Sequence, residues 1–196
     1  MRLSHQLRRF SSAPPPPLAT LLAGFHEESG KALAGEITPS WMQGQTTFGG
    51  LSAALCVLGA RRLIADAEPA LPLRSAQVCF LGAAGGAVSI GGQVLRRGRS
   101  SAFVRADVTS SGGVATSSTF AFCKTRSSMV DRSFVTPPDP ATLPPPEECT
   151  SLRECLGASP AFMENNFELR IARRGSADHG GSNLCGGPVG EARVST

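Results

Sequence analysis

The sequence WMQGQTTFGGLSAALCVLGARRLIA, residues 41–65, decides the fold of this chain. From Leu51 to Ala60 almost every residue is apolar or small, which predicts a helix over 48–65 that is apolar around most of its circumference. Such a helix has to be covered by other elements on most sides. The apolar run ends at Arg61-Arg62, well short of the roughly 20 residues needed to cross a bilayer, so we expect a buried helix and no membrane span.

Four segments after this helix alternate apolar and polar residues with a period of two, which predicts strands. They are Leu73 to Leu81, Val88 to Leu95, Ala102 to Thr109 and Val114 to Lys124. Glycine-rich connections of hairpin length join them, so we expect an antiparallel meander. A helix over 18–25 and a strand over 32–37 are expected before the long helix, with Thr46 or Thr47 as its N-cap.

The lengths of these elements agree with one compact arrangement. A helix over 48–65 is about 27 Å long, and a strand of eight residues also spans about 27 Å. A strongly curled sheet is therefore long enough to cover the helix from end to end. The sequence predicts an α+β fold in which an antiparallel curled sheet wraps around one long apolar helix.

Composition divides the chain into a folded centre and two flanks. Residues 1–17 combine arginine, serine and four prolines with no acidic residue, which indicates a mitochondrial or plastid transit segment or, alternatively, a disordered basic start in a cytoplasmic protein. The folded domain is expected over 18–126. A proline-rich linker follows over 127–160, then one strand-like segment over 161–174, and 175–196 are expected to be disordered.

Charge and cysteine usage exclude several classes of function. The net charge of +4 in 196 residues, without aromatic residues among the arginines, fits a phosphorylated ligand better than nucleic acid. The six cysteines form no CxxC pair, and His5, His26 and His179 are isolated, so we expect free thiols and no metal. The loop Leu81 to Gly86 leads into a strand rather than a helix, which argues against a dinucleotide-binding loop.

Several motifs in the centre of the chain resemble one family. Trp41 precedes Phe48-Gly49-Gly50, Pro72-Leu73-Arg74-Ser75 leads to Phe80-Leu81, and Leu95-Arg96-Arg97-Gly98-Arg99-Ser100 follows. This order over residues 24–125 resembles the amino-terminal half of the double-hotdog acyl-CoA thioesterases of the thioesterase-like superfamily. The resemblance implies a hotdog fold, and it implies that 162–171 begin a second hotdog that this sequence does not complete. The family's Asp, Thr and Gln catalytic set belongs to that second half, so no residue here inherits those roles.

The resemblance implies hydrolysis of fatty acyl-CoA to free acid and CoA, with no cofactor other than the CoA of the substrate. A single hotdog leaves a sheet edge and the helix end open, so we expect a homodimer or pairing with another hotdog. The alternative is a non-catalytic module that binds acyl-CoA or pairs with another subunit. Hotdog hydratase activity lacks support because no Asp and His pair lies near the helix start.

The candidate reaction centre is the start of the long helix. Unpaired N–H groups and the helix dipole stabilise a developing oxyanion, and Gly49 and Gly50 leave room for a thioester beside Phe48. The alternative is that both glycines serve packing alone. Gln45 is the candidate that orients the attacking water, although an amide is a poor general base. The alternative is that Gln45 is a surface residue of a turn.

A second candidate site lies at a predicted hairpin tip. Arg97 and Arg99, with Ser100 beside them, place two guanidinium groups where they suit the phosphates of CoA. The alternative is a tight turn with solvated charges. Asp107 faces away from the apolar side of its strand and is expected to pair with an arginine rather than to act in catalysis.

Overall fold

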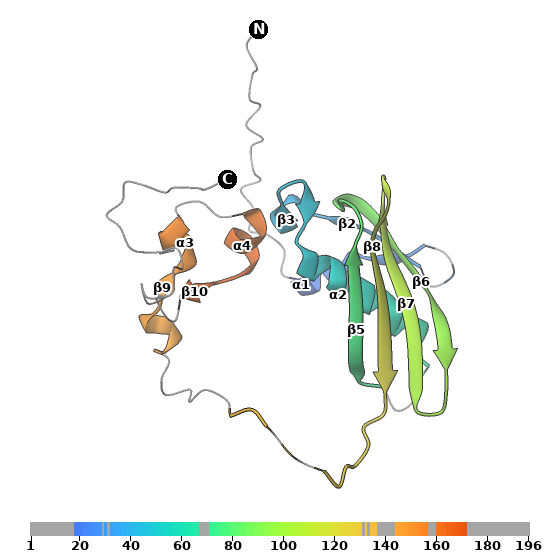
Figure 1. Cartoon of the computed structure of the whole chain (residues 1–196). Helices are drawn as coiled ribbons and strands as arrows, with labels where there is room; N and C mark the ends of the chain where they lie inside the picture. Colours follow the sequence, from blue (N-terminus) through green and yellow to red (C-terminus); the bar gives the residue numbers. More distant parts are fainter. Residues whose placement is uncertain are drawn as a thin grey trace.

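The computed structural model describes residues 18–28, 30, 32–66, 71–130, 132, 134–136, 144–156 and 160–171. Figure 1 shows a sheet packed on a central helix, and a smaller group of elements beyond a long connection. The elements up to residue 123 are α1 (Leu18–Ala23), β1 (His26–Glu27), β2 (Leu33–Ile37), η1 (Pro39–Trp41), β3 (Met42–Gln43), β4 (Thr46–Thr47), α2 (Gly49–Leu63), β5 (Leu73–Phe80), β6 (Gly86–Arg97), β7 (Ser101–Ser110) and β8 (Gly113–Cys123). The strand period and the long helix therefore agree with the sequence-based expectation.

The main sheet has six strands in the order β1-β2-β6-β7-β8-β5, and every neighbouring pair is antiparallel. Strands β6, β7 and β8 form the expected meander. The expectation that β5 continues into β6 as a hairpin is wrong, because β5 pairs with β8 and β6 lies between β2 and β7. The curl of the sheet brings its two sides close enough for residues 81–85 to make this connection, which passes the start of α2.

Helix α2 packs against β6, β7 and β8 through one stripe of its surface. The stripe is fully buried and consists of Leu51, Ser52, Leu55, Cys56, Gly59 and Ala60. It meets inward-facing residues such as Ile90, Val104 and Phe120, each at most 1% exposed. The opposite face, with Val57 and Leu58, is only half-buried. The curled antiparallel sheet therefore packs over the helix as the sequence predicts, and the helix face with Val57 and Leu58 stays half-buried.

Strand β5 is an edge strand and is exposed on both faces. Its inward-facing residues Ala76, Val78 and Phe80 follow the expected alternation, since they lie opposite Phe120, Ser118 and Thr116 of β8. These side chains are nevertheless not buried, because α2 makes most of its contacts with the three strands β6, β7 and β8. Phe80 is 61% exposed. Most of this apolar face is therefore open within the described chain, although the Phe80 ring approaches Gly49 of α2.

The segment beyond 126 forms short elements rather than a long strand. It comprises η3 (Pro146–Glu148), β9 (Thr150–Ser151), α3 (Leu152–Leu156), α4 (Ala161–Asn166) and β10 (Arg170–Ile171). The expected strand over 161–174 is reduced to β10, which pairs with β9, because α4 takes up 161–166. The segments 1–17 and 175–196 and much of the proline-rich linker lie outside the described residues.

The cysteines correct one expectation. Cys155 is disulfide-bonded, so the expectation that all thiols are free is wrong there. Cys56, Cys79, Cys123 and Cys149 are free thiols. Burial raises the pKa of the Cys56 thiol, with a smaller contribution in the same direction from the Asp107 charge. Cys56 therefore acts as a small apolar core residue.

Gly91 and Gly92, two adjacent glycines of β6, test how closely β6 packs against β7 and α2. A Cβ at Gly92 would lie 2.3 Å from the Arg105 carbonyl oxygen and 3.1 Å from Leu63 of α2, whereas a Cβ at Gly91 would meet nothing within 4 Å. We expect Gly92→Ala to lower the free energy of unfolding by about 1–3 kcal/mol, because the backbone of β7 has to move. Gly91→Ala should leave it unchanged or raise it by up to about 1 kcal/mol. Urea unfolding followed by circular dichroism measures both, and equal effects would contradict this account.

Candidate functional site

Two backbone donors point out of the start of α2. Phe48 is the N-cap residue, and its carbonyl oxygen accepts from the N–H groups of Leu51 and Ser52 at 2.9 and 3.2 Å. The N–H groups of Gly49 and Gly50 have no backbone or side-chain acceptor among the described residues. The helix dipole adds about half a positive charge at the same place. This end of α2 can therefore bind an anionic or developing oxyanionic oxygen.

A small hairpin fixes the position of this helix end. Strands β3 and β4 pair through Met42 with Thr47, and the Phe48 N–H donates to the Trp41 carbonyl at 2.8 Å. Thr47 donates from its N–H to Ala84 at 2.7 Å and from its hydroxyl to Trp41 at 3.2 Å. The expected threonine N-cap is wrong, because both threonines belong to β4 and bond to the hairpin and to the 81–85 connection. The helix start is anchored by strands instead of a capping side chain.

Aromatic rings pack closely on both glycines. A Cβ at Gly50 would lie 2.3 Å from the Phe48 ring, and one at Gly49 would lie 3.1 Å from the Phe80 ring. Glycine is thus required at 50 by the close approach of a ring. Gly49 is half-buried and Gly50 is exposed. Phe48, Gly49 and Gly50 lie together at the start of α2, and the absence of side chains on both glycines leaves room for the two rings.

Helix α4 covers this end of α2 with two further rings. Phe162 stacks on Phe48 with the ring centroids 4.5 Å apart and the planes at 7°. Phe167 makes edge contacts with Phe48 at 5.4 Å and with Trp41 at 6.0 Å. The Asn166 side chain donates to the Ser40 carbonyl at 2.8 Å. Residues more than 110 positions apart in sequence therefore form one aromatic cluster, Trp41, Phe48, Phe162 and Phe167.

Sequence reasoning missed the contribution of α4. Its pattern, Ala-Phe-Met-Glu-Asn-Asn, carries no signal that it contacts residues near 48, since a short apolar segment after a linker can dock in many places. The helix also carries Glu164, which is exposed. Gln45 lies exposed at the β3–β4 turn beside Gly44, whose φ is +66°, and its side chain bonds to no described residue.

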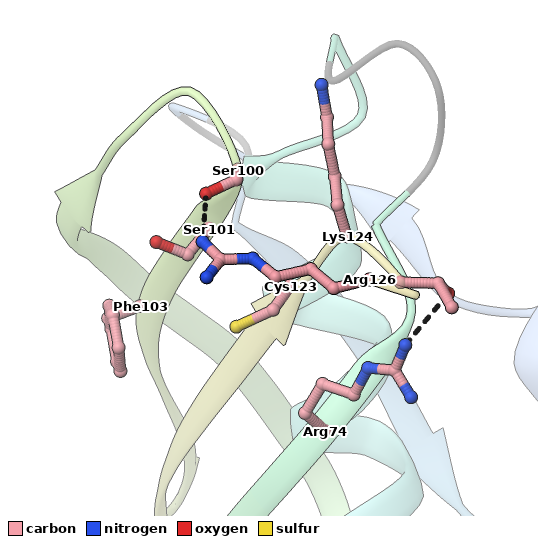
Figure 2. A pocket seen from close by; sticks show the side chains of 8 residues that line it. Arg74, Ser100, Ser101, Phe103, Cys123, Lys124 and Arg126 are labelled. Carbon is pink, nitrogen blue, oxygen red and sulfur yellow. Dashed lines mark hydrogen bonds between the residues drawn. The ribbon is translucent and has the colours of Figure 1, made fainter. Parts of the chain in front are cut away.

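The predicted phosphate-binding residues lie at the opposite end of α2. Arg97 donates from Nη1 to both carboxylate oxygens of Asp66 at 2.8 Å, just beyond the end of the helix. Arg99 and Ser100 form the turn between β6 and β7. Because fifteen residues of helix rise about 22 Å, this turn and Gly50 do not share a site within one chain. Figure 2 shows Ser100 at the rim of a cleft at this end.

Among the described residues, the other titratable groups do not gather into a catalytic cluster. Asp107 accepts from the Ser117 hydroxyl at 2.5 Å and pairs with Arg105 at 3.2 Å, on the outer face of the sheet. Within the described ranges, no three His, Cys, Asp or Glu side chains are placed to hold a metal ion. No helix among the described residues is long and apolar enough to span a membrane.

The chain is similar to one protein family and to several solved structures. Residues 37–123 match the acyl-CoA thioesterase N-terminal domain family. A protein of unknown function with a hotdog fold from Alicyclobacillus acidocaldarius is 21% identical, with a TM-score of 0.61 over 76% of this chain and 53% of that one. A candidate thioesterase from Novosphingobium aromaticivorans is also 21% identical, with a TM-score of 0.58 over 76% and 58%.

A candidate thioesterase II from Thermobifida fusca gives a TM-score of 0.53 at 21% identity, over 71% of this chain and 50% of that one. These likenesses show that the fold is the hotdog fold. The chain spans about half the length of these three structures. No curated protein matches the sequence.

The single tryptophan of the chain reports whether α4 is docked. Trp41 is 4% exposed and touches Phe167. We expect Phe162→Ala to release α4, because it removes the ring stacked on Phe48, and to shift Trp41 fluorescence to longer wavelength. Phe134→Ala, at a 92% exposed ring, is the matched control and should leave the spectrum unchanged. An unshifted spectrum for Phe162→Ala would show that the aromatic cluster does not hold α4.

Proposed function

We propose that this chain is an acyl-CoA thioesterase that hydrolyses fatty acyl-CoA to free acid and CoA at the start of α2. The observation that carries the proposal is the pair of unpaired N–H groups of Gly49 and Gly50. They lie inside the region that matches the acyl-CoA thioesterase N-terminal domain family. A transit segment at 1–17 would place the activity in a mitochondrion or plastid.

In the proposed reaction, the thioester carbonyl oxygen accepts hydrogen bonds from the N–H groups of Gly49 and Gly50. Water attacks the carbonyl carbon, and the negative charge that develops on the oxygen is stabilised by both donors and by the helix dipole. The tetrahedral intermediate collapses with cleavage of the carbon–sulfur bond. The proton lost by the water passes to the CoA thiolate, so the products are a carboxylate, a free thiol and one proton from the acid.

The hydrophobic surroundings suit an acyl chain. Phe48, Phe80 and Phe162 surround the helix end, and the exposed inward face of β5 continues from it with Val78 and Ala76. An aliphatic chain bound along this face would be removed from water, at about 0.8 kcal/mol for each buried CH₂ group. This supports a fatty acyl substrate rather than a short polar one.

The open apolar surface supports a second hotdog as partner. Strand β5 has an unpaired edge and an exposed inward face, and the outward stripe of α2 with Val57 and Leu58 is only half-buried. An unpaired edge next to an apolar face is a template for strand addition. A second copy of this chain, or another hotdog, would cover both. The same partner is the proposed source of the group that activates water, with Gln45 as the orienting residue from this chain.

A non-catalytic acyl-CoA-binding or subunit-pairing module is the second candidate. Two observations favour it: the Phe48 ring lies over Gly50, and Phe162 stacks on that ring. A ring held in this position restricts access to the Gly50 N–H. In this reading the helix end binds an acyl-CoA or a partner without turnover.

Two substitutions at Gly49 separate its N–H group from its lack of a side chain. Proline is well tolerated at the first position of a helix, and Phe48 already has the extended ψ of 127° that a following proline requires. We expect Gly49→Pro to lower kcat for acyl-CoA hydrolysis by about 100-fold, since one oxyanion donor is lost. Gly49→Ala retains the donor and should keep most of the kcat. Thiol release from acyl-CoAs of several chain lengths measures both.

Wild-type protein that binds acyl-CoA without releasing thiol would refute the enzyme and favour the binding module. Equal kcat values for Gly49→Pro and Gly49→Ala would refute the role of the N–H group. Thermal unfolding of both variants controls for loss of fold.

The partner surface has its own test. Ala76 is exposed on the inward face of β5, so Ala76→Lys places a charge where the second hotdog would pack. We expect the wild-type chain to sediment as a dimer and Ala76→Lys as a monomer. Leu95→Lys introduces the same residue at an exposed position of β6, which β7 and β8 separate from β5, and should remain dimeric. A monomeric wild-type chain, or an Ala76→Lys variant that stays dimeric, would contradict pairing of two copies through β5.

A further inference from the structure

A basic cleft lies at the end of the sheet remote from Gly49 and Gly50. It has a volume of about 490 Å³ and is formed by the start of β5, the β6–β7 turn, the start of β7 and the residues after β8. The lining residues that matter here are Arg74, Ser100, Phe103, Cys123, Thr125 and Arg126. Figure 2 shows the Arg126 side chain crossing the cleft, with Arg74 on one side and Phe103 on the other.

Both arginines are oriented by neutral groups. Arg74 donates from Nη2 to the Thr125 hydroxyl at 2.8 Å, and Arg126 donates from Nη2 to the Ser100 hydroxyl at 3.4 Å. A hydroxyl acceptor holds a guanidinium group in place without neutralising its charge. The remaining N–H groups of each guanidinium stay available to a ligand, in the planar arrangement that matches phosphate oxygens.

The charge of the cleft is not balanced by acidic residues. Within the described part of the chain, Arg62, Arg97, Arg105 and Arg170 each have an ion-pair partner, whereas no described carboxylate lies within 4.0 Å of Arg74, Lys124 or Arg126. Figure 2 shows the Lys124 ammonium pointing away from Arg126, so Lys124 adds to the potential around the cleft without converging with the two arginines. Such a site attracts a ligand that carries at least two negative charges.

An aromatic ring accompanies the two cations. Phe103 faces outward from β7, is 39% exposed and lines the cleft. An inorganic phosphate needs no such ring, but a purine base stacks on one. We infer that this cleft binds a nucleoside diphosphate, with the phosphates on Arg74 and Arg126 and the base against Phe103.

Two sources share this chemistry: the nucleotide portion of CoA, and a free nucleotide. Arg97, which the sequence offers for CoA phosphates, is bonded to Asp66, whereas Arg74 and Arg126 are not paired with a carboxylate. The site therefore uses different arginines from those the sequence indicated. Its existence does not depend on thioester cleavage at α2, because it is tested by binding alone.

Isothermal titration calorimetry on the full chain with ADP, adenosine and pyrophosphate as probes tests the site. ADP should bind with an affinity that falls as salt rises, and Arg74→Gln and Arg126→Gln should each weaken it by about tenfold. Phe103→Ala should weaken ADP by about tenfold and leave pyrophosphate unchanged, because only the base contacts the ring. Arg132→Gln, at an exposed arginine outside the cleft, is the matched control and should bind ADP like the wild-type chain.

A competition with CoA then identifies the source. Displacement of ADP by CoA assigns the cleft to the nucleotide portion of CoA, and ADP binding that CoA does not displace assigns it to a free nucleotide. The inference is overturned if ADP does not bind, or if its affinity is the same in Arg74→Gln, Arg126→Gln and Arg132→Gln. Each of these outcomes can be reached whether or not thiol release is observed with acyl-CoA.

Discussion

Helix α2 lies so close to the sheet that position 59 has no room for a methyl group. A Cβ there would be 2.6 Å from the Ile90 side chain, and Gly92 on the facing strand is equally confined. This close approach depends on small residues on both sides and buries the core between one helical stripe and three strands. Because the helix is held along its length, both of its ends have fixed positions relative to the sheet. The two candidate sites lie at these two ends.

The two ends of α2 carry the opposite partial charges of the helix dipole, and different groups lie at each end. At the start, Gly49 and Gly50 present N–H groups next to aromatic rings. At the other end, Arg61 places a cation in the last turn of the helix. It donates to the Leu71 carbonyl at 2.6 Å and lies 4.6 Å from the centre of the Phe122 ring. The basic cleft lies beyond that end. The proposed thioester site with its apolar surroundings and the basic cleft are thus separated by the length of the helix.

Sequence periodicity was sufficient for the long strands, for α2 and for the placement of Phe48, Gly49 and Gly50 at its start. It could not give the pairing of β5 with β8, because alternation fixes the faces of a strand and leaves its neighbour open. The ion pair of Arg97 with Asp66 and the stack of Phe162 on Phe48 were also out of reach. Both join residues far apart in sequence, and neither leaves a local pattern. The site residues that the sequence missed all come from such contacts.

The separation of the two sites within one chain bears on how a partner would be used. Strand β5 carries Arg74 at one end and Phe80, beside Gly49, at the other. Its eight residues span about 27 Å, slightly more than the length of α2. If two copies join their β5 edges antiparallel, symmetry places the Arg74 end of one strand next to the Phe80 end of the other. The basic cleft of each copy would then lie toward the partner's helix start. Pairing through β5 would therefore bring together two sites that a single chain keeps apart.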